Sequence, residues 1–343
     1  MKAIRITEPG RVQIIEKEAP VPGEHEALLR VRFGGICGAD VASYTGNQPF
    51  TTYPRIPGHE FSAEIVSLPA GTEGFRVGET VTCNPYFNCG KCYACRRGLV
   101  NACIDNQTMG VQRDGAFQEY VTMPMERLIH GKGLRAEELA LIEPFSISCH
   151  ALSRAQINPG DRMLIMGAGP IGLFALMRAK TMGAAVMTAD LLDNRLELAK
   201  VYGADRTVNV KEEDLRAAGA EFTGGDGFDV CVEACGAPET FLNCIEEAAH
   251  GANIILIGNG KRETTFLHSV ILKKELNVFG SRNAYTRDFE TLIDLVAAGK
   301  ADVMKMVSGI CDMENAAEAF ERLSHNDGTL AKLLIRFPEG GAE

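Results

Sequence analysis

Four cysteines lie close together in one short segment, a spacing typical of a metal centre. Cys89, Cys92, Cys95 and Cys103 follow the pattern C-x2-C-x2-C-x7-C. Four thiolates this close can surround one tetrahedral zinc ion, and with every position filled by protein the zinc is structural. It would stabilise a loop that has little core of its own. Four free thiols are the alternative, and two disulfides are disfavoured in a reducing compartment.

A glycine-rich turn separates an apolar strand-like run from a helix-like segment. The run at 162–166 is followed directly by the sequence GAGPIG at 167–172. In a G-x-G-x-x-G turn the first glycine permits the bend, the second admits a pyrophosphate, and the third allows helix and strand to pack closely. The helix N-terminus adds N–H donors and positive potential. The residues assigned to a dinucleotide are Gly167, Gly169, Pro170, Ile171 and Gly172.

An acid closes the next apolar run and predicts which dinucleotide binds. Asp190 ends the run 185–190 and follows Gly172 by 18 residues, close to the roughly 20 residues expected between the third glycine and a ribose-binding acid. Its carboxylate would accept hydrogen bonds from the ribose hydroxyls and repel a 2′-phosphate, so NAD is expected rather than NADP. Arg195 is assigned to the same site.

A second, open metal site has candidate ligands in scattered segments. These are Cys37, His59, Glu60 and Glu143. A catalytic zinc needs three protein ligands and one free position, and thiolate, imidazole and carboxylate all suit it. A set of Cys, His and Glu also binds cobalt or iron. The spacing alone does not show that these side chains meet.

The pattern along the chain predicts an α/β protein with two domains. Residues 1–148 are rich in glycine and proline, with alternation at 27–33, which indicates short strands and loops. Residues 149–280 alternate strands with helices, which favours a doubly wound parallel sheet. The segment 281–343, with an amphipathic helix around 288–298 and a strand at 331–337, is expected to return to the first domain.

Composition excludes several classes of partner. The 343 residues carry a net charge of −10 and no long basic run, so a nucleic acid is not expected. No apolar run is long enough for a membrane span, and the N-terminus lacks the pattern of a signal peptide. Eleven clustered cysteines argue against a secreted disulfide framework and predict a cytoplasmic protein.

These motifs, in this order, resemble the zinc-dependent medium-chain alcohol dehydrogenases over essentially the whole chain. The resemblance implies a GroES-like catalytic domain, a Rossmann domain, an active site in the cleft between them, and a homo-oligomer, either tetramer or dimer. In the polyol and threonine dehydrogenase branch it implies a catalytic zinc on Cys37, His59 and Glu143, with Glu60 beside the metal and able to exchange with water. Two zinc ions and NAD are therefore expected.

The sequence departs from the family pattern at two positions that, in relatives, relay the proton released by the substrate hydroxyl. Relatives commonly carry Ser or Thr two residues after the cysteine ligand and His five residues after it. Here those positions hold Ala39 and Ala42, which cannot pass a proton. Ser43, Tyr44, Glu60 or bound water could substitute, and the choice stays open.

Segments at 46–50, 53–55, 143–148 and 280–284 are similar to sugar-acid dehydrogenases of the L-galactonate 5-dehydrogenase type. The expected reaction is oxidation of a secondary hydroxyl on a small polyhydroxy substrate, an aldonate or a polyol. A carboxylate substrate needs a cationic partner, and the candidates are Arg55, Arg113 and Arg282, with Tyr86 as a further pocket residue.

Two other functions stay open. One is an L-threonine or short-diol dehydrogenase on the same scaffold, although Tyr86 occupies a position where threonine dehydrogenases typically carry His. The other is a regulatory protein that binds zinc and NAD without catalysis, favoured only by Ala39 and Ala42. An open zinc site would serve no purpose in such a binder.

Overall fold

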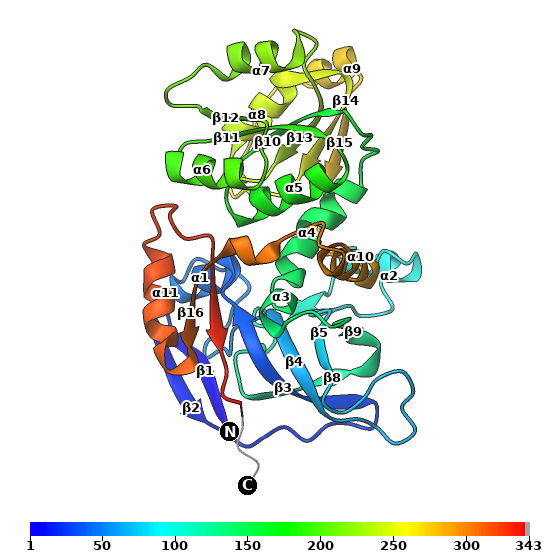
Figure 1. Ribbon diagram of the computed structural model, residues 1–343, viewed down its shortest axis with the longest axis vertical. Helices are drawn as coiled ribbons and strands as arrows, with labels where there is room; N and C mark the ends of the chain where they lie inside the picture. The colour runs from blue at the N-terminus through cyan, green and yellow to red at the C-terminus, as the bar shows by residue number, and fades with distance from the viewer. Residues whose placement is uncertain (340–343) are drawn as a thin grey trace. The chain divides into compact units, whose positions relative to one another are not determined.

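Two separate sheets organise the chain (Figure 1). The computed structural model describes residues 1–339, which fold into two compact units. Unit 1 is 1–144 together with the segment from 285 onward, and unit 2 is 145–284. Helix α4 (Ile142–Ser153) contains the first boundary. The predicted boundaries at 148 and 280 lie about one helical turn from these limits, and the last four residues of the predicted segment 281–343 lie outside the described range.

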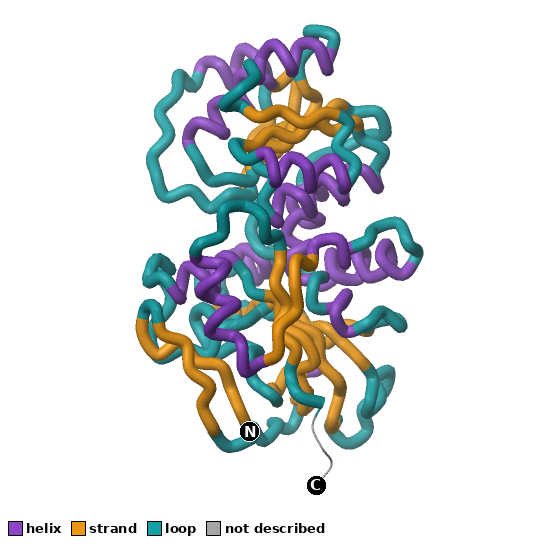
Figure 2. The backbone as a smooth tube through the Cα atoms, turned by 60° about the vertical axis from the view of Figure 1, so that its left-hand side comes forward, coloured by secondary structure: helices purple, strands orange, loops and turns teal. Residues whose placement is uncertain are grey.

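Unit 1 is built on a seven-stranded sheet with the order β16-β17-β3-β4-β5-β9, in which β8 also pairs with β3. Strands β1 and β2 form a separate hairpin beside the N-terminus (Figure 2), and β6 pairs with β7. The elements are β1 (Lys2–Glu8), β2 (Arg11–Glu16), β3 (Glu26–Gly35), α1 (Gly38–Tyr44), β4 (Glu60–Ser67), β5 (Thr80–Cys83), β6 (Tyr86–Phe87), α2 (Tyr93–Arg96), β7 (Gln107–Thr108), β8 (Tyr120–Pro124), β9 (Leu128–His130), α3 (Ala136–Leu139), α10 (Thr286–Ala297), β16 (Val307–Asp312), α11 (Ala316–Ser324) and β17 (Lys332–Arg336).

The alternation predicted at 27–33 is confirmed in β3. Ala27, Leu29, Val31 and Phe33 are buried, whereas the residues between them are partly exposed. Successive side chains of a strand point to opposite faces, so this strand places one apolar row in the core of unit 1. Its position at the centre of the sheet makes it the reference for the register of the neighbouring strands.

The C-terminal segment adds a strand to this sheet. The predicted helix around 288–298 is α10, and the predicted strand at 331–337 is β17, which pairs antiparallel with β3. Among the described residues, no helix combines the length and the apolar character that crossing a membrane requires.

Unit 2 is a parallel six-stranded sheet with the order β12-β11-β10-β13-β14-β15. The chain builds outward from β10 on one side and then crosses to the other, which is the doubly wound order. Helices α5 and α6 cover one face, and α7, α8 and α9 cover the other (Figure 1). The elements are β10 (Arg162–Met166), α5 (Pro170–Thr181), β11 (Ala185–Asp190), α6 (Asp193–Val201), β12 (Arg206–Asn209), α7 (Leu215–Thr223), β13 (Phe228–Glu233), α8 (Pro238–Glu247), β14 (Ala248–Leu256), α9 (Ser269–Lys274) and β15 (Asn277–Gly280).

The glycine turn between β10 and α5 has the backbone that the sequence predicts. Gly167 adopts φ +103°, a left-handed value that favours glycine. A Cβ on Gly172 would lie 1.8 Å from the Gly167 carbonyl oxygen, whereas a Cβ on Gly169 would meet no atom within 4 Å. The turn is therefore tight on the helix side and open at Gly169, where a pyrophosphate needs access.

This difference predicts opposite effects of two alanine substitutions. Gly172→Ala places a methyl group against a carbonyl oxygen, so we expect a loss of about 1–3 kcal/mol of folding free energy, measured by thermal or urea unfolding. Gly169→Ala is the matched control, and its midpoint should stay near that of the parent. Equal midpoints for both variants would contradict the packing argument.

Candidate metal centres and dinucleotide site

Three of the predicted metal ligands meet in a buried cluster in unit 1. The donor atoms of Cys37, His59 and Glu60 all lie within 4.8 Å of one another. The sheet register produces this, because β3 and β4 pair with Gly35 opposite Glu60, and Cys37 follows β3 directly. A Cβ on Gly35 would lie 2.4 Å from Glu60 Oε2, so only glycine leaves room for that carboxylate.

Glu143 lies at the edge of the same cluster. It is buried in the first turn of α4, and its carboxylate accepts a hydrogen bond from the Tyr86 hydroxyl. The pKa of Glu143 is raised to about 7. Burial is the main cause, Glu60 adds to the shift, and His59 opposes it. Within the described part of the chain, the group of three donors that meets the 4.8 Å limit contains Glu60 rather than Glu143.

A lysine that the sequence analysis overlooked pairs with Glu60. Lys332 Nζ donates to both carboxylate oxygens, at 2.6 Å to Oε2. Both side chains are almost completely buried. The sequence feature that could have revealed this pair is the lysine within the apolar strand predicted at 331–337. A lysine buried in such a strand requires an anionic partner.

Asp40 supports the cluster from behind and was noticed in the sequence only as part of a motif. One carboxylate oxygen accepts from the Cys37 amide at 2.9 Å, and the other accepts from the Gly58 amide at 3.1 Å. The second oxygen also lies 3.9 Å from His59 Nδ1. Asp40 therefore fixes the backbone at Cys37 and at Gly58, the residue before His59. A carboxylate behind a metal-binding histidine commonly has this role.

The cluster fits a zinc ion. Thiolate, imidazole and carboxylate donors suit zinc, and His59 Nδ1 faces Asp40 at 3.9 Å, so the other ring nitrogen is the one available to a metal. Burial and the charge of Glu60 raise the pKa of the Cys37 thiol. Burial lowers the pKa of His59, but the anionic neighbours Cys37 and Asp40 outweigh it and raise the pKa overall. A dication bound here would favour the deprotonated forms of these donors.

Two of the candidate proton carriers are bonded to residues outside the cluster. Ser43 Oγ lies 2.8 Å from Thr51 Oγ1 and donates to the Ala39 carbonyl. The Tyr44 hydroxyl donates to Glu321 at 2.5 Å. Glu60 is held by Lys332. None of these hydrogen bonds joins Ser43 or Tyr44 to Cys37.

The cysteine quartet forms a second compact group around α2. Cys89, Cys92, Cys95 and Cys103 have their sulfur atoms within 4.8 Å of one another. Backbone amides point at these sulfurs, with Cys89 N 3.2 Å from Cys103 Sγ and Cys92 N 3.4 Å from Cys89 Sγ. The amides of Cys95 and Ile104 donate to Cys92 and lower the pKa of its thiol to about 6. Four sulfurs with N–H donors aimed at them fit a closed tetrahedral zinc site.

In unit 2 the Asp190 carboxylate lies beside the glycine turn. It accepts from the amides of Ala168 at 2.8 Å and Leu191 at 2.7 Å. Arg195 Nη1 lies 3.6 Å from the same carboxylate. Helix α5 begins at Pro170 with Gly169 as its N-cap, so its first N–H groups face the open side of the turn.

The candidate substrate residues have different environments. Arg55 pairs with Asp114 at 3.2 Å and with Thr52 at 2.7 Å, so its guanidinium is already engaged. Arg113 lies over the Phe87 ring, 3.7 Å from the centroid. Arg282 is exposed in unit 2, directly after β15.

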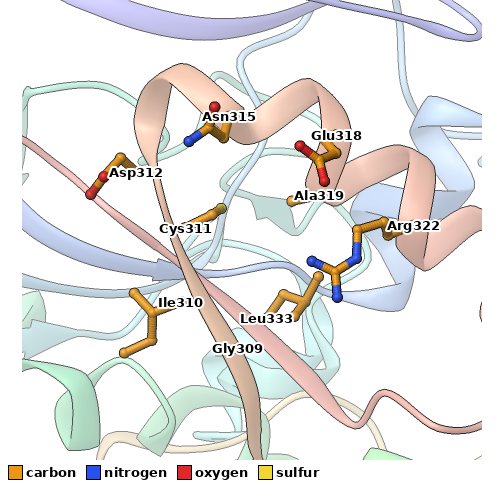
Figure 3. Close-up of a pocket in the computed structure, with 9 residues that line it drawn as sticks. All are labelled: Gly309, Ile310, Cys311, Asp312, Asn315, Glu318, Ala319, Arg322 and Leu333. Carbon is orange, nitrogen blue, oxygen red and sulfur yellow. The ribbon is translucent and has the colours of Figure 1, made fainter.

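A separate hollow of about 310 Å³ lies between β16 and α11 (Figure 3). Charged side chains, including Asp312, Glu318 and Arg322, border it. None of the cluster or quartet residues lines it, so it is distinct from the metal centres.

The chain matches two family models. Residues 23–133 match the alcohol dehydrogenase GroES-like domain, and residues 170–298 match the zinc-binding dehydrogenase domain. The L-galactonate-5-dehydrogenase of Escherichia coli K12 is 36% identical over 98% of this chain and 99% of its own length. The sorbitol dehydrogenase of Halalkalibacterium halodurans is 35% identical, also over 98% and 99%.

A solved structure shows the same fold. RspB of E. coli CFT073, described as a short chain alcohol dehydrogenase and complexed with NADH, has a TM-score of 0.92, 33% identity and coverage of 98% of this chain and 99% of its own. The fold and the site define an oxidoreductase of the medium-chain type. The chain belongs to the zinc-binding alcohol dehydrogenases and is a zinc-containing, NAD-dependent member, as the sequence predicted.

Replacing Asp40 tests its supporting role. Asp40→Asn turns an NH2 group toward one of the two amides, so we expect a loss of about 1–3 kcal/mol of stability and about 10–100-fold weaker zinc binding. Thermal unfolding and zinc titration measure both. Asp312→Asn removes an exposed carboxylate paired with Arg336 and serves as the control. If the two variants behave alike, Asp40 does not support the cluster.

Proposed function

We propose that this protein oxidises a secondary hydroxyl of a small sugar acid or polyol to a ketone, with NAD⁺ as the hydride acceptor. The observation that carries the proposal is the cluster of Cys37, His59 and Glu60 donor atoms within 4.8 Å of one another, with the Asp40 carboxylate behind the imidazole. We assign Cys37, His59 and Glu143 as ligands of a catalytic zinc, with Glu60 beside it. The quartet would hold a second, structural zinc, which gives two zinc ions per chain.

The reaction balances as alcohol plus NAD⁺ giving ketone, NADH and one proton. A zinc ion bound here would act as a Lewis acid that lowers the pKa of the substrate hydroxyl. The ligand residues fix where that hydroxyl lies, and Asp40 and Tyr86 fix the ligands through their hydrogen bonds. His59, Glu60 and Glu143 are buried, which limits the access of bulk water to them. The released proton passes to Glu60 or to water, since Ala39 and Ala42 cannot carry it.

Support for a polyhydroxy substrate comes from the relatives named for L-galactonate and sorbitol. For an aldonate, we propose Arg113 as the partner of the carboxylate. Its guanidinium lies on the ring of Phe87, which follows Tyr86 in strand β6. Arg55 is engaged with Asp114 and is a weaker candidate.

We further propose a cytoplasmic homo-oligomer, a tetramer or a dimer. All eleven cysteines are free thiols, which suits a reducing compartment. Strand β15 ends its sheet, and the exposed apolar side chains of Leu267, Leu272 and Val278 lie on or near it. An unpaired strand edge with apolar neighbours favours association, and a monomer in light scattering at working concentration would remove this proposal.

The direct test of the activity is NADH production by purified protein. We expect reduction of NAD⁺ with hexonates or polyols, abolished by a chelator and restored by zinc, with two zinc ions per chain by atomic emission. Activity on L-threonine alone would replace the sugar-acid assignment with the threonine alternative. A protein that holds two zinc ions, binds NADH and oxidises nothing on the panel would contradict the enzymatic function.

Cofactor preference should depend on Asp190. Asp190→Ser removes the charge that repels a 2′-phosphate and frees Arg195, so the ratio of kcat/KM for NAD⁺ over NADP⁺ should fall at least about tenfold, equivalent to about 1.4 kcal/mol. Asp193→Ser, on the first turn of α6, is the matched control and should leave the ratio unchanged. An unaltered ratio in the Asp190 variant would show that another group selects the cofactor.

A further inference from the structure

The Lys332–Glu60 pair lies beside the cluster of candidate metal ligands. The two side chains retain only 4% and 1% of their exposure. The ammonium contacts both Glu60 oxygens, at 2.6 Å for Oε2. A Glu60 oxygen nevertheless lies within 4.8 Å of the Cys37 and His59 donor atoms. Glu60 is therefore close enough to bind a metal in that cluster and is held by a lysine instead.

The backbone makes this arrangement rigid. Strand β17 pairs with β3, and the Ile36 amide donates to the Leu333 carbonyl at 3.0 Å. The residue before Cys37 is thus bonded to the residue after Lys332. Gly35 leaves space for Glu60, since any Cβ there would clash with Oε2. The position of the lysine relative to the cysteine ligand is set by the sheet and not by a mobile loop.

The local charges favour a fixed ammonium. The ammonium is almost completely buried and donates hydrogen bonds to both Glu60 oxygens. A buried lysine is costly unless it is paired and hydrogen-bonded. Here the ammonium is paired with the equally buried Glu60 carboxylate, so replacing it with an uncharged residue would leave that carboxylate without a counterion.

We propose that Lys332 is a positioning residue that keeps Glu60 out of the coordination shell, so that the zinc retains an open position for the substrate. The inference rests on the proposed function. With three protein ligands a zinc site is open and catalytic, whereas a fourth closes it. Without Lys332, the Glu60 carboxylate would lose its counterion and become that fourth ligand.

The test uses the full chain with cobalt(II) in place of zinc and azide as a small exogenous ligand. Azide shifts the visible spectrum of cobalt only where a coordination position is open. We expect a shift in the parent protein and azide binding at least about tenfold weaker in Lys332→Met. The closed site should also release its metal more slowly to a chelator.

Two further variants keep the result interpretable. Lys332→Met with Glu60→Gln removes the competing carboxylate and should restore the azide response. Lys332→Gln retains a hydrogen bond to Glu60 and provides the comparison if the methionine variant does not fold, with azide binding weakened several-fold. Azide binding and metal release equal to the parent in a folded Lys332 variant would overturn the proposal while the parent stays active. A parent without a cobalt response or activity would instead overturn the proposed function.

Discussion

The structure of unit 1 depends on one electrostatic constraint: several acidic groups lie close together in a small buried volume. Burial and the charge of Glu60 raise the pKa values of Cys37 and Glu143, and Asp40 accepts a hydrogen bond from the Cys37 amide. Burial makes such a concentration of charge unfavourable without cations. Lys332 supplies one positive charge, and a zinc ion would supply the rest. The site is therefore built around a cation that the chain itself does not provide.

Sheet register is what brings these groups together. Strands β3, β4 and β17 are neighbours in one sheet, although Glu60 and Lys332 are 272 residues apart in the chain. Pairing of Gly35 with Glu60 on one side and with Leu334 on the other fixes both distances. The C-terminal strand is thus part of the metal centre, and a fold that lost β17 would lose the counterion of Glu60.

The sequence predicted the features that local patterns encode. The quartet lies within one short segment, the glycine turn joins adjacent elements, and the alternation in β3 reflects a period of two residues. It did not predict the role of Lys332 or Asp40, because these follow from contacts between segments distant in the chain. The same limit applies to Glu60. The resemblance predicted that it lies beside the metal, but did not predict its ion pair with Lys332.

The most direct test of this account is a crystal structure of the purified protein with anomalous diffraction measured on both sides of the zinc absorption edge. The account predicts one zinc peak enclosed by the four quartet sulfurs and a second bonded to Cys37, His59 and Glu143, with Glu60 still on Lys332. A single peak at the quartet, with no metal beside His59 in zinc-supplemented protein, would contradict it.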